Sequence, residues 1–212
     1  LKMRFILFLF IFISFKSGAS HVMGGEITYK CVGVNSYVFE LTFYRDCNGA
    51  DINNVSEVLR VWNHPTLNTI SLPFVSREDI SPTCSPVSGG PSPLLCGLNS
   101  NGGNGIGAIE KIIYRSAPLN ISGSPPSQGW AFTYENFSRS NAITNISNPS
   151  TYGITLTAKI YASPNLIAGD CYDSSPLFLQ KPSFVHCASN PYQYNPNAID
   201  SDLDSLYFDF GI

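Results

Sequence analysis

Apolar and polar side chains alternate in several short runs of this chain. The clearest run covers residues 37–44, in which large apolar residues recur at every odd position. A period of two places these side chains on one face of a strand, where they can be buried together. Residues 26–31 alternate likewise, and residues 33–36 between the two runs have the composition of a turn. The pattern predicts a β-hairpin.

Strand patterns continue along the chain, whereas no window of ordinary helix length shows a capped apolar stripe with a period of 3.6 residues. Short strands separated by Gly, Pro, Asn and Ser clusters are typical of a β-sandwich. We therefore expect an all-β fold, a β-sandwich of immunoglobulin-like or jelly-roll-like type. The further expected strands lie at residues 58–62, 70–74, 109–114, 130–134, 154–160 and 205–212.

The first 20 residues have the features of a secretory signal peptide. Lys2 and Arg4 precede an apolar run at residues 5–15, and small residues including Gly18 and Ser20 follow it. The run is too short to cross a bilayer comfortably, since a transmembrane helix needs roughly 20 apolar residues. The signal predicts export without a transmembrane anchor, and a mature chain that starts near residue 21.

Charge and composition exclude one class of function. The formal net charge is −3, and removal of residues 1–20 takes away three positive charges and makes it −6. Phosphate binding depends on clustered Lys and Arg. We expect no nucleic-acid partner.

Six cysteines follow the predicted signal, and an even number in an exported chain favours disulfides. Residues 81–107 are rich in Pro and Gly, and a bond between Cys84 and Cys96 is the most economical way to close such a long loop. The same reasoning favours a bond between Cys171 and Cys187. Cys31 and Cys47 fall at opposite ends of the expected hairpin, some 25 Å apart at about 3.3 Å per residue, so either a bend brings them together or each pairs elsewhere.

Catalytic motifs are absent from the sequence. The Gly-rich stretch 103–107 lacks the strand and the Gly-Lys-Ser/Thr of a phosphate loop, and there is no nucleophile elbow or zinc-protease helix. His21, His64 and His186 have no second ligand at metal-site spacing. We expect no enzymatic activity.

Acidic residues at alternate positions form the sharpest candidate site. Asp200, Asp202 and Asp204 lie two residues apart, with Asn197 just before them. The side chains of these four residues offer oxygen ligands to a cation. Such ligands suit calcium, which prefers six to eight oxygens. In an extended segment the three carboxylates would share one face, so the segment must bend or a cation must neutralise the charge.

Five stretches of the chain have recognisable motifs. They are GGEITYKC at 24–31, YRDCNG at 44–49, RSNAITN at 139–145, Asp-Ser-Ser-Pro at 173–176 and NAIDSDLDSL at 197–206. Together they resemble the N-terminal region of large secreted surface proteins of Bacteroidetes, which are gliding-motility-associated or adhesin-like cargo of type nine secretion. Members of that group tend to carry Gly in the acidic run where this chain has Leu203.

The resemblance implies a secreted, surface-located structural or adhesive module at the start of a larger modular protein. We expect a β-sandwich over residues 21–175 and the opening of a truncated cadherin- or immunoglobulin-like module over residues 176–212. Surface glycans or cell-surface proteins are the expected partners. The alternative is an exported carbohydrate-binding module or carbohydrate-active enzyme, in which exposed Trp62 and Trp130 stack on sugar rings.

Overall fold

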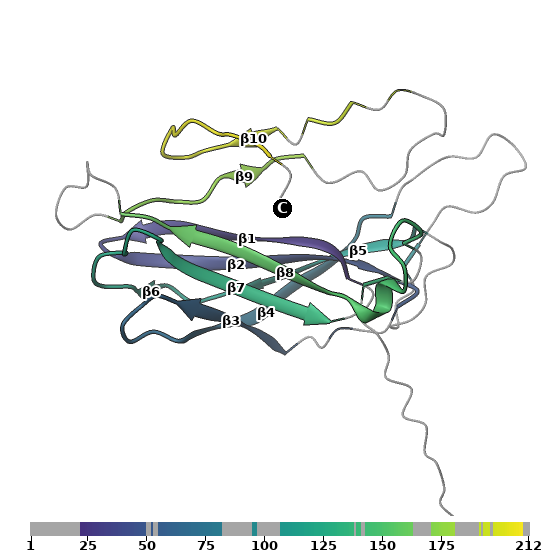
Figure 1. Ribbon diagram of the computed structural model, residues 1–212, viewed down its shortest axis with the longest axis horizontal. Helices are drawn as coiled ribbons and strands as arrows, with labels where there is room; N and C mark the ends of the chain where they lie inside the picture. The colour runs from purple at the N-terminus through teal and green to yellow at the C-terminus, as the bar shows by residue number, and fades with distance from the viewer. Residues whose placement is uncertain are drawn as a thin grey trace, which may run out of the picture.

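The computed structural model describes residues 22–49, 52, 55–81, 95–96, 107–137, 139–140, 143–162, 171–180, 191, 193–195 and 197–209. Strands dominate these residues, and their helical structure is a 3₁₀ turn, η1 (Pro149–Thr151). The strands are β1 (Val22–Gly33), β2 (Ser36–Asp46), β3 (Ser56–Trp62), β4 (Thr69–Asp79), β5 (Ile109–Arg115), β6 (Leu119–Asn120), β7 (Trp130–Phe137), β8 (Gly153–Ile160), β9 (Leu177–Phe178) and β10 (Ala198–Ile199) (Figure 1).

The predicted hairpin is formed by β1 and β2. The two strands pair antiparallel up to Gly33 opposite Ser36, and Asn35 in the turn has a left-handed backbone with a φ of 51°. Asn tolerates this conformation because its short polar side chain can hydrogen-bond locally. The odd positions of β2 point into the core, where Tyr37, Phe39, Leu41 and Phe43 are fully buried.

The main sheet folds into two layers because β4 takes part in both. The A layer contains β1, β2, β5 and the second half of β4, with β6 paired to β2, whereas the B layer contains the first half of β4, β3, β7 and β8. A register shift between Phe74 and Ser76 marks the point where β4 passes from one layer to the other. Bulges of this kind bend strands at sandwich corners. The all-β sandwich is therefore confirmed.

The opposite edge of the sandwich is closed by contacts between β1 and β8 (Figure 1). The Tyr29 hydroxyl of β1 donates to the Lys159 carbonyl of β8 at 2.8 Å. Gly25 permits this close approach, since a Cβ there would lie 2.5 Å from the Thr42 carbonyl oxygen and 2.9 Å from Leu156 Cδ1. The result is a nearly closed, barrel-like sandwich.

Aromatic side chains fill the space between the layers. The rings of Phe39 and Phe132 lie 4.5 Å apart between centroids, and those of Phe43 and Tyr134 lie 4.7 Å apart. Such pairs contribute beyond the area they bury. Residues on β2 and β7 thereby hold the A and B layers together.

The C-terminal residues form a small separate sheet, in which β9 pairs antiparallel with β10. Residues 205–209, expected to be a strand, are not one, because no neighbouring strand among the described residues supplies the hydrogen bonds that a strand needs. Residues 210–212 and most of the long loop 81–107 lie outside the described residues. In the part of the chain that the structure describes, no helix has the length and apolar character needed to cross a membrane.

Candidate functional site: the acidic loop and the edge of the first strand

Residues 171–175, which we call the edge segment, lie along the free edge of β1. The Ser175 amide donates to the Tyr29 carbonyl at 2.8 Å, and the Tyr29 amide donates to Ser175 Oγ at 2.8 Å. The Cys31 amide donates to Ser174 Oγ at 3.3 Å. Serine hydroxyls therefore satisfy backbone groups of β1 that would otherwise require a paired strand.

A disulfide between Cys31 and Cys171 fixes the edge segment to the hairpin, with 5.8 Å between the two Cα atoms. The expected bond between Cys171 and Cys187 is therefore wrong. Sequence proximity favoured it, but the fold returns the chain to β1 after a separation of 140 residues. Cys187 itself lies outside the described residues.

The second disulfide joins Cys47 at the end of β2 to Cys96, with 5.4 Å between the Cα atoms. The expected bond between Cys84 and Cys96 is wrong, because strand β2 ends beside the loop and offers a partner there. Cys31 and Cys47 each pair elsewhere, which was one of the two alternatives that the sequence left open. Cys84 is not among the described residues.

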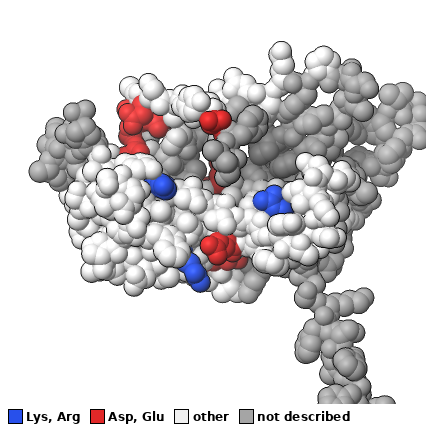
Figure 2. All heavy atoms as spheres, in the orientation of Figure 1, with Lys and Arg blue, Asp and Glu red and all other residues white. Residues whose placement is uncertain are grey.

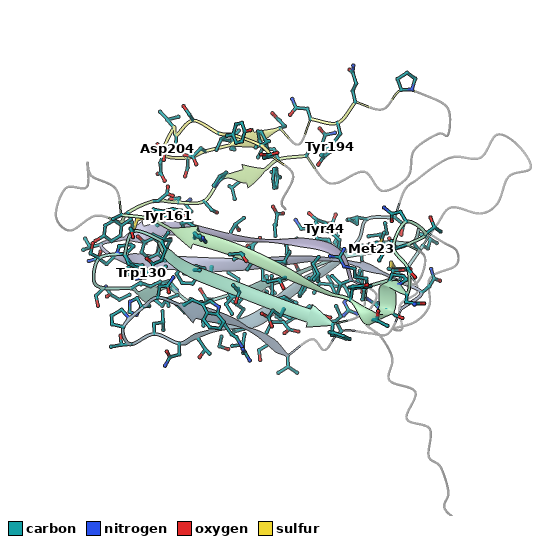
Figure 3. The ribbon with its side chains drawn as sticks, viewed as in Figure 1. Met23, Tyr44, Trp130, Tyr161, Tyr194 and Asp204 are labelled. Atoms are coloured by element: carbon teal, nitrogen blue, oxygen red, sulfur yellow. A yellow bond between two sulfur atoms is a disulfide. The ribbon has the colours of Figure 1, made fainter. Side chains whose placement is uncertain are left out.

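The acidic loop, residues 200–204, packs against the edge segment. The Ser174 amide donates to Asp202 Oδ2 at 2.6 Å, while Asp200 Oδ1 accepts from the amides of Asp202 at 2.8 Å and Asp204 at 3.2 Å. The loop bends at a turn over residues 201–202. Figure 3 shows Asp204 in this loop beyond the sandwich, and Figure 2 shows acidic side chains gathered there.

Leu203 gives the loop its shape at a conformational cost. Its φ of 65° lies in the left-handed region, and its side chain is 91% exposed. Such a backbone favours Gly, which has no Cβ to strain it. Leu203 therefore adopts a backbone conformation natural for glycine.

Asp173 of the edge segment brings a further carboxylate to this region. Its pKa is raised to about 6, chiefly by burial; a hydrogen bond from the Tyr29 hydroxyl opposes the shift, and the carboxylates of Asp202 and Asp200 add to it. The Tyr29 hydroxyl lies 3.1 Å from Asp173 Oδ2 and 2.8 Å from the Lys159 carbonyl oxygen, so these two acceptors share its single proton. Burial, followed by the charge of Asp173, also raises the pKa of Tyr29. Burial and the neighbouring carboxylates therefore both disfavour the charged form of Asp173.

The donor set fits a hard cation in its chemistry but is not gathered into a site. Asp173, Asp200, Asp202 and Asp204 offer only oxygen ligands, as calcium requires. Within the described residues, however, no three of these carboxylates bring ligand atoms within 4.8 Å of one another. Asn197 lies just before β10 with a left-handed φ of 49°. Calcium binding would require the acidic loop to contract around the ion.

One group of described residues does bring three ligand atoms within 4.8 Å of one another: Cys47, Cys96 and Glu110. This group is not a metal site. The two sulfurs are joined in a disulfide, and Glu110 forms ion pairs with Arg45 and Arg77. A disulfide sulfur is not the thiolate that binds metals.

Arg45 and Asp46 lie at the far end of β2 and tie neighbouring segments together. Arg45 is 2% exposed, pairs with Glu110 of β5, and donates from Nη1 to the Gly49 carbonyl at 2.9 Å. Asp46 accepts from the Asn48 amide at 2.9 Å and from the Ser140 hydroxyl at 3.3 Å. Residues 44–49 and 139–145 were noted in the sequence only through the resemblance. Their buried contacts show that they stabilise the fold.

The aromatic residues considered for sugar stacking differ in exposure. Trp130 is fully buried, so the expectation that it is exposed is wrong: its place in an alternating strand puts it in the core. Trp62 is 47% exposed. His64 has a packing role, because its Nδ1 accepts from the amides of Thr66 and Leu67 at 3.2 Å and 2.9 Å. His21 and His186 lie outside the described residues.

Comparison with known proteins adds no relative: no family model, no curated protein and no solved structure matches this chain.

Proposed function

We propose that this chain is a secreted or cell-surface module with a structural and adhesive role, the N-terminal part of a larger modular surface protein linked to gliding motility or cell adhesion. Two disulfides among the described residues are compatible with an extracellular location. Several residues in the stretches that resemble such proteins, among them Tyr29, Arg45 and Ser175, are buried and join neighbouring segments of the sandwich. A rigid, cross-linked frame suits a protein that must withstand tension.

The observation that carries the proposal is the position of the disulfide between Cys31 and Cys171. It links the first strand to the edge segment, which leads to the C-terminal residues. A force applied at the two ends of the described chain runs from β1 through this bond to residue 171. The intervening β2 to β8 are outside the force path, so tension does not act directly on them.

Calcium binding at Asp200, Asp202, Asp204 and Asn197 belongs to the same proposal. Support comes from the all-oxygen donor set and from the concentration of carboxylates beside the edge segment. A cation there would neutralise mutual repulsion and stiffen the connection that transmits the force. Surface glycans or other cell-surface proteins are the proposed partners.

Single-molecule pulling of the full chain by its two ends tests the proposal. With the disulfides intact, we expect extension without release of the sandwich. Reduction frees the 140-residue separation between Cys31 and Cys171, which adds roughly 500 Å at 3.6 Å per residue.

The variant Cys47→Ser/Cys96→Ser is the matched control, because it removes the disulfide that lies inside the shielded region. It should extend like the oxidised wild type, whereas Cys31→Ser/Cys171→Ser should release the sandwich without any reductant. A wild-type chain whose extension did not depend on reduction would refute the mechanical role.

A further inference from the structure

The outer face of the B layer presents an ordered array of side chains. Strand register places Trp62, Ala131 and Lys159 in one row across β3, β7 and β8. The next row, two residues along, contains Arg60, Thr133 and Thr157. Directly opposite residues in a sheet have Cβ atoms about 5 Å apart.

The indole of Trp62 is held in one orientation on this face. Its Nε1 donates to Thr133 Oγ1 at 2.8 Å, diagonally across β7 from the position opposite Trp62. Ala131 lies between the two, and although it points outward it is only 8% exposed. One indole face therefore covers Ala131 and the other faces solvent, which accounts for the 47% exposure of Trp62.

The outer face around the indole carries polar side chains of both charges, together with the exposed Val58 and Tyr161. Arg60, Lys159 and Thr157 lie around it, and Glu135 follows on β7. In the view of Figure 1, β7 and β8 lie in front of β1 and β2, and Figure 2 shows this face mostly white with few charged side chains. The face therefore offers no strong net charge to attract an ionic partner.

These features match the chemistry of an uncharged sugar. A pyranose ring has an apolar C–H face that packs on an aromatic ring and a rim of hydroxyls that bond to charged and hydroxyl side chains. A protein partner would instead favour a desolvated pocket enclosed by apolar neighbours. We propose that the outer face of the B layer binds an uncharged glycan, one sugar ring of which stacks on Trp62.

This inference rests on the proposed surface function and names the partner and the face that contacts it. Thr133 acts as a positioning residue, since it fixes the indole without needing to touch the sugar. Arg60 and Thr157 supply hydrogen bonds at the edge of the ring. Residues of the A layer and of the acidic loop take no part.

The chain carries only two tryptophans, which makes fluorescence a specific probe. Trp130 is fully buried, so acrylamide should quench Trp62 alone. The full chain is titrated with dextran, mannan and xylan as uncharged probes, and with heparin as a charged one. We expect at least one uncharged polysaccharide to protect Trp62 from acrylamide.

Variants assign the binding to this face. Trp62→Ala should weaken retention on the immobilised polysaccharide by about tenfold or more, equivalent to 1.4 kcal/mol. Thr133→Val should weaken it while the indole remains. Tyr207→Ala removes an aromatic residue that is 86% exposed in the C-terminal segment and should change nothing. Emission from buried Trp130 verifies that each variant is folded.

Three results would overturn the inference: no protection by any uncharged polysaccharide, protection by heparin alone, or equal retention of Trp62→Ala and wild type. None of these results would change the expected outcome of the pulling experiment, because that experiment does not involve the outer face of the B layer. Failure of the glycan site and failure of the mechanical role are therefore distinguishable.

Discussion

At the scale of single residues, Asp202 has two separable roles. Its Oδ2 accepts from the Ser174 amide, which joins the acidic loop to the edge segment, and it is a proposed calcium ligand. Asp204 is exposed, and its side chain is assigned only the second role. Comparison of the two positions therefore separates a hydrogen bond from cation binding.

We expect 10 mM calcium to raise the melting temperature of the wild-type chain by roughly 3–6 °C. A millimolar extracellular site stabilises the folded state by about 1.4 kcal/mol at this concentration, and each kcal/mol is worth about 2–4 °C in a chain of this size. Asp204→Ala should match the wild type in EDTA and lose the calcium shift. Asp202→Ala should melt lower even in EDTA and also lose the shift.

Differential scanning calorimetry with and without calcium measures both effects. Magnesium at the same concentration is the control for general screening, because it prefers a smaller octahedral site and should shift the melting temperature less. If calcium does not change the melting temperature of the wild type, the proposed calcium binding is wrong. The role of the acidic loop is then limited to the hydrogen bond of Asp202.

At the scale of elements, the edge segment takes the place of a strand beside β1. Ser175 is buried, and its hydroxyl accepts from the amide of Tyr29, a residue that is only 4% exposed. Loss of that hydroxyl leaves a buried amide without its acceptor, which costs about 1–3 kcal/mol. The Tyr29 amide at the edge of β1 thus depends on the Ser175 side chain.

We expect Ser175→Ala to lower the free energy of unfolding by about 1–3 kcal/mol in urea denaturation. Ser71→Ala is the matched control, because Ser71 is exposed on β4 and a surface substitution of this kind stays within about 0.5 kcal/mol. The Tyr29 amide should also exchange its hydrogen faster in Ser175→Ala than in the wild type. Equal stability of the two variants would show that the edge segment does not support β1.

At the scale of the whole molecule, the sandwich is closed where β1 meets β8. That closure depends on the absence of a side chain at Gly25, where a Cβ would meet both the Thr42 carbonyl and Leu156. Adjacent Gly24 has no atom within 4 Å of an added Cβ. Two neighbouring glycines therefore differ in what they contribute to the closed form.

We expect Gly25→Ala to destabilise the fold by about 1–3 kcal/mol, the usual cost of overpacking. Gly24→Ala should be neutral or slightly stabilising, because Ala restricts the unfolded chain. Thermal unfolding followed by circular dichroism compares the two. If both substitutions cost the same, the contact between β1 and β8 is too loose to close the sandwich.

Local pattern was sufficient for the long strands of the sandwich but not for the two-residue strands β6, β9 and β10. The alternation at residues 37–44 identified β2 and its buried face, and the turn composition at 33–36 identified the hairpin, because both depend on side chains a few residues apart. The acidic run and the stretch at residues 173–176 were also visible as motifs. Their contact with each other, through Ser174 and Asp202, was not.

The sequence by itself therefore determined the all-β class, the long strands of the sandwich and their inward faces, since these follow from the period of neighbouring residues. Only the tertiary structure decided the partners of Cys31 and Cys47, the contact between β1 and β8 and the packing partner of Trp130, which is Tyr172. Residues 205–209, which the sequence pattern predicted to be a strand, do not form one in the tertiary structure. The physical reason is that pairing, disulfide bonds and burial depend on distances between residues far apart in the chain, which the order of side chains along it does not specify.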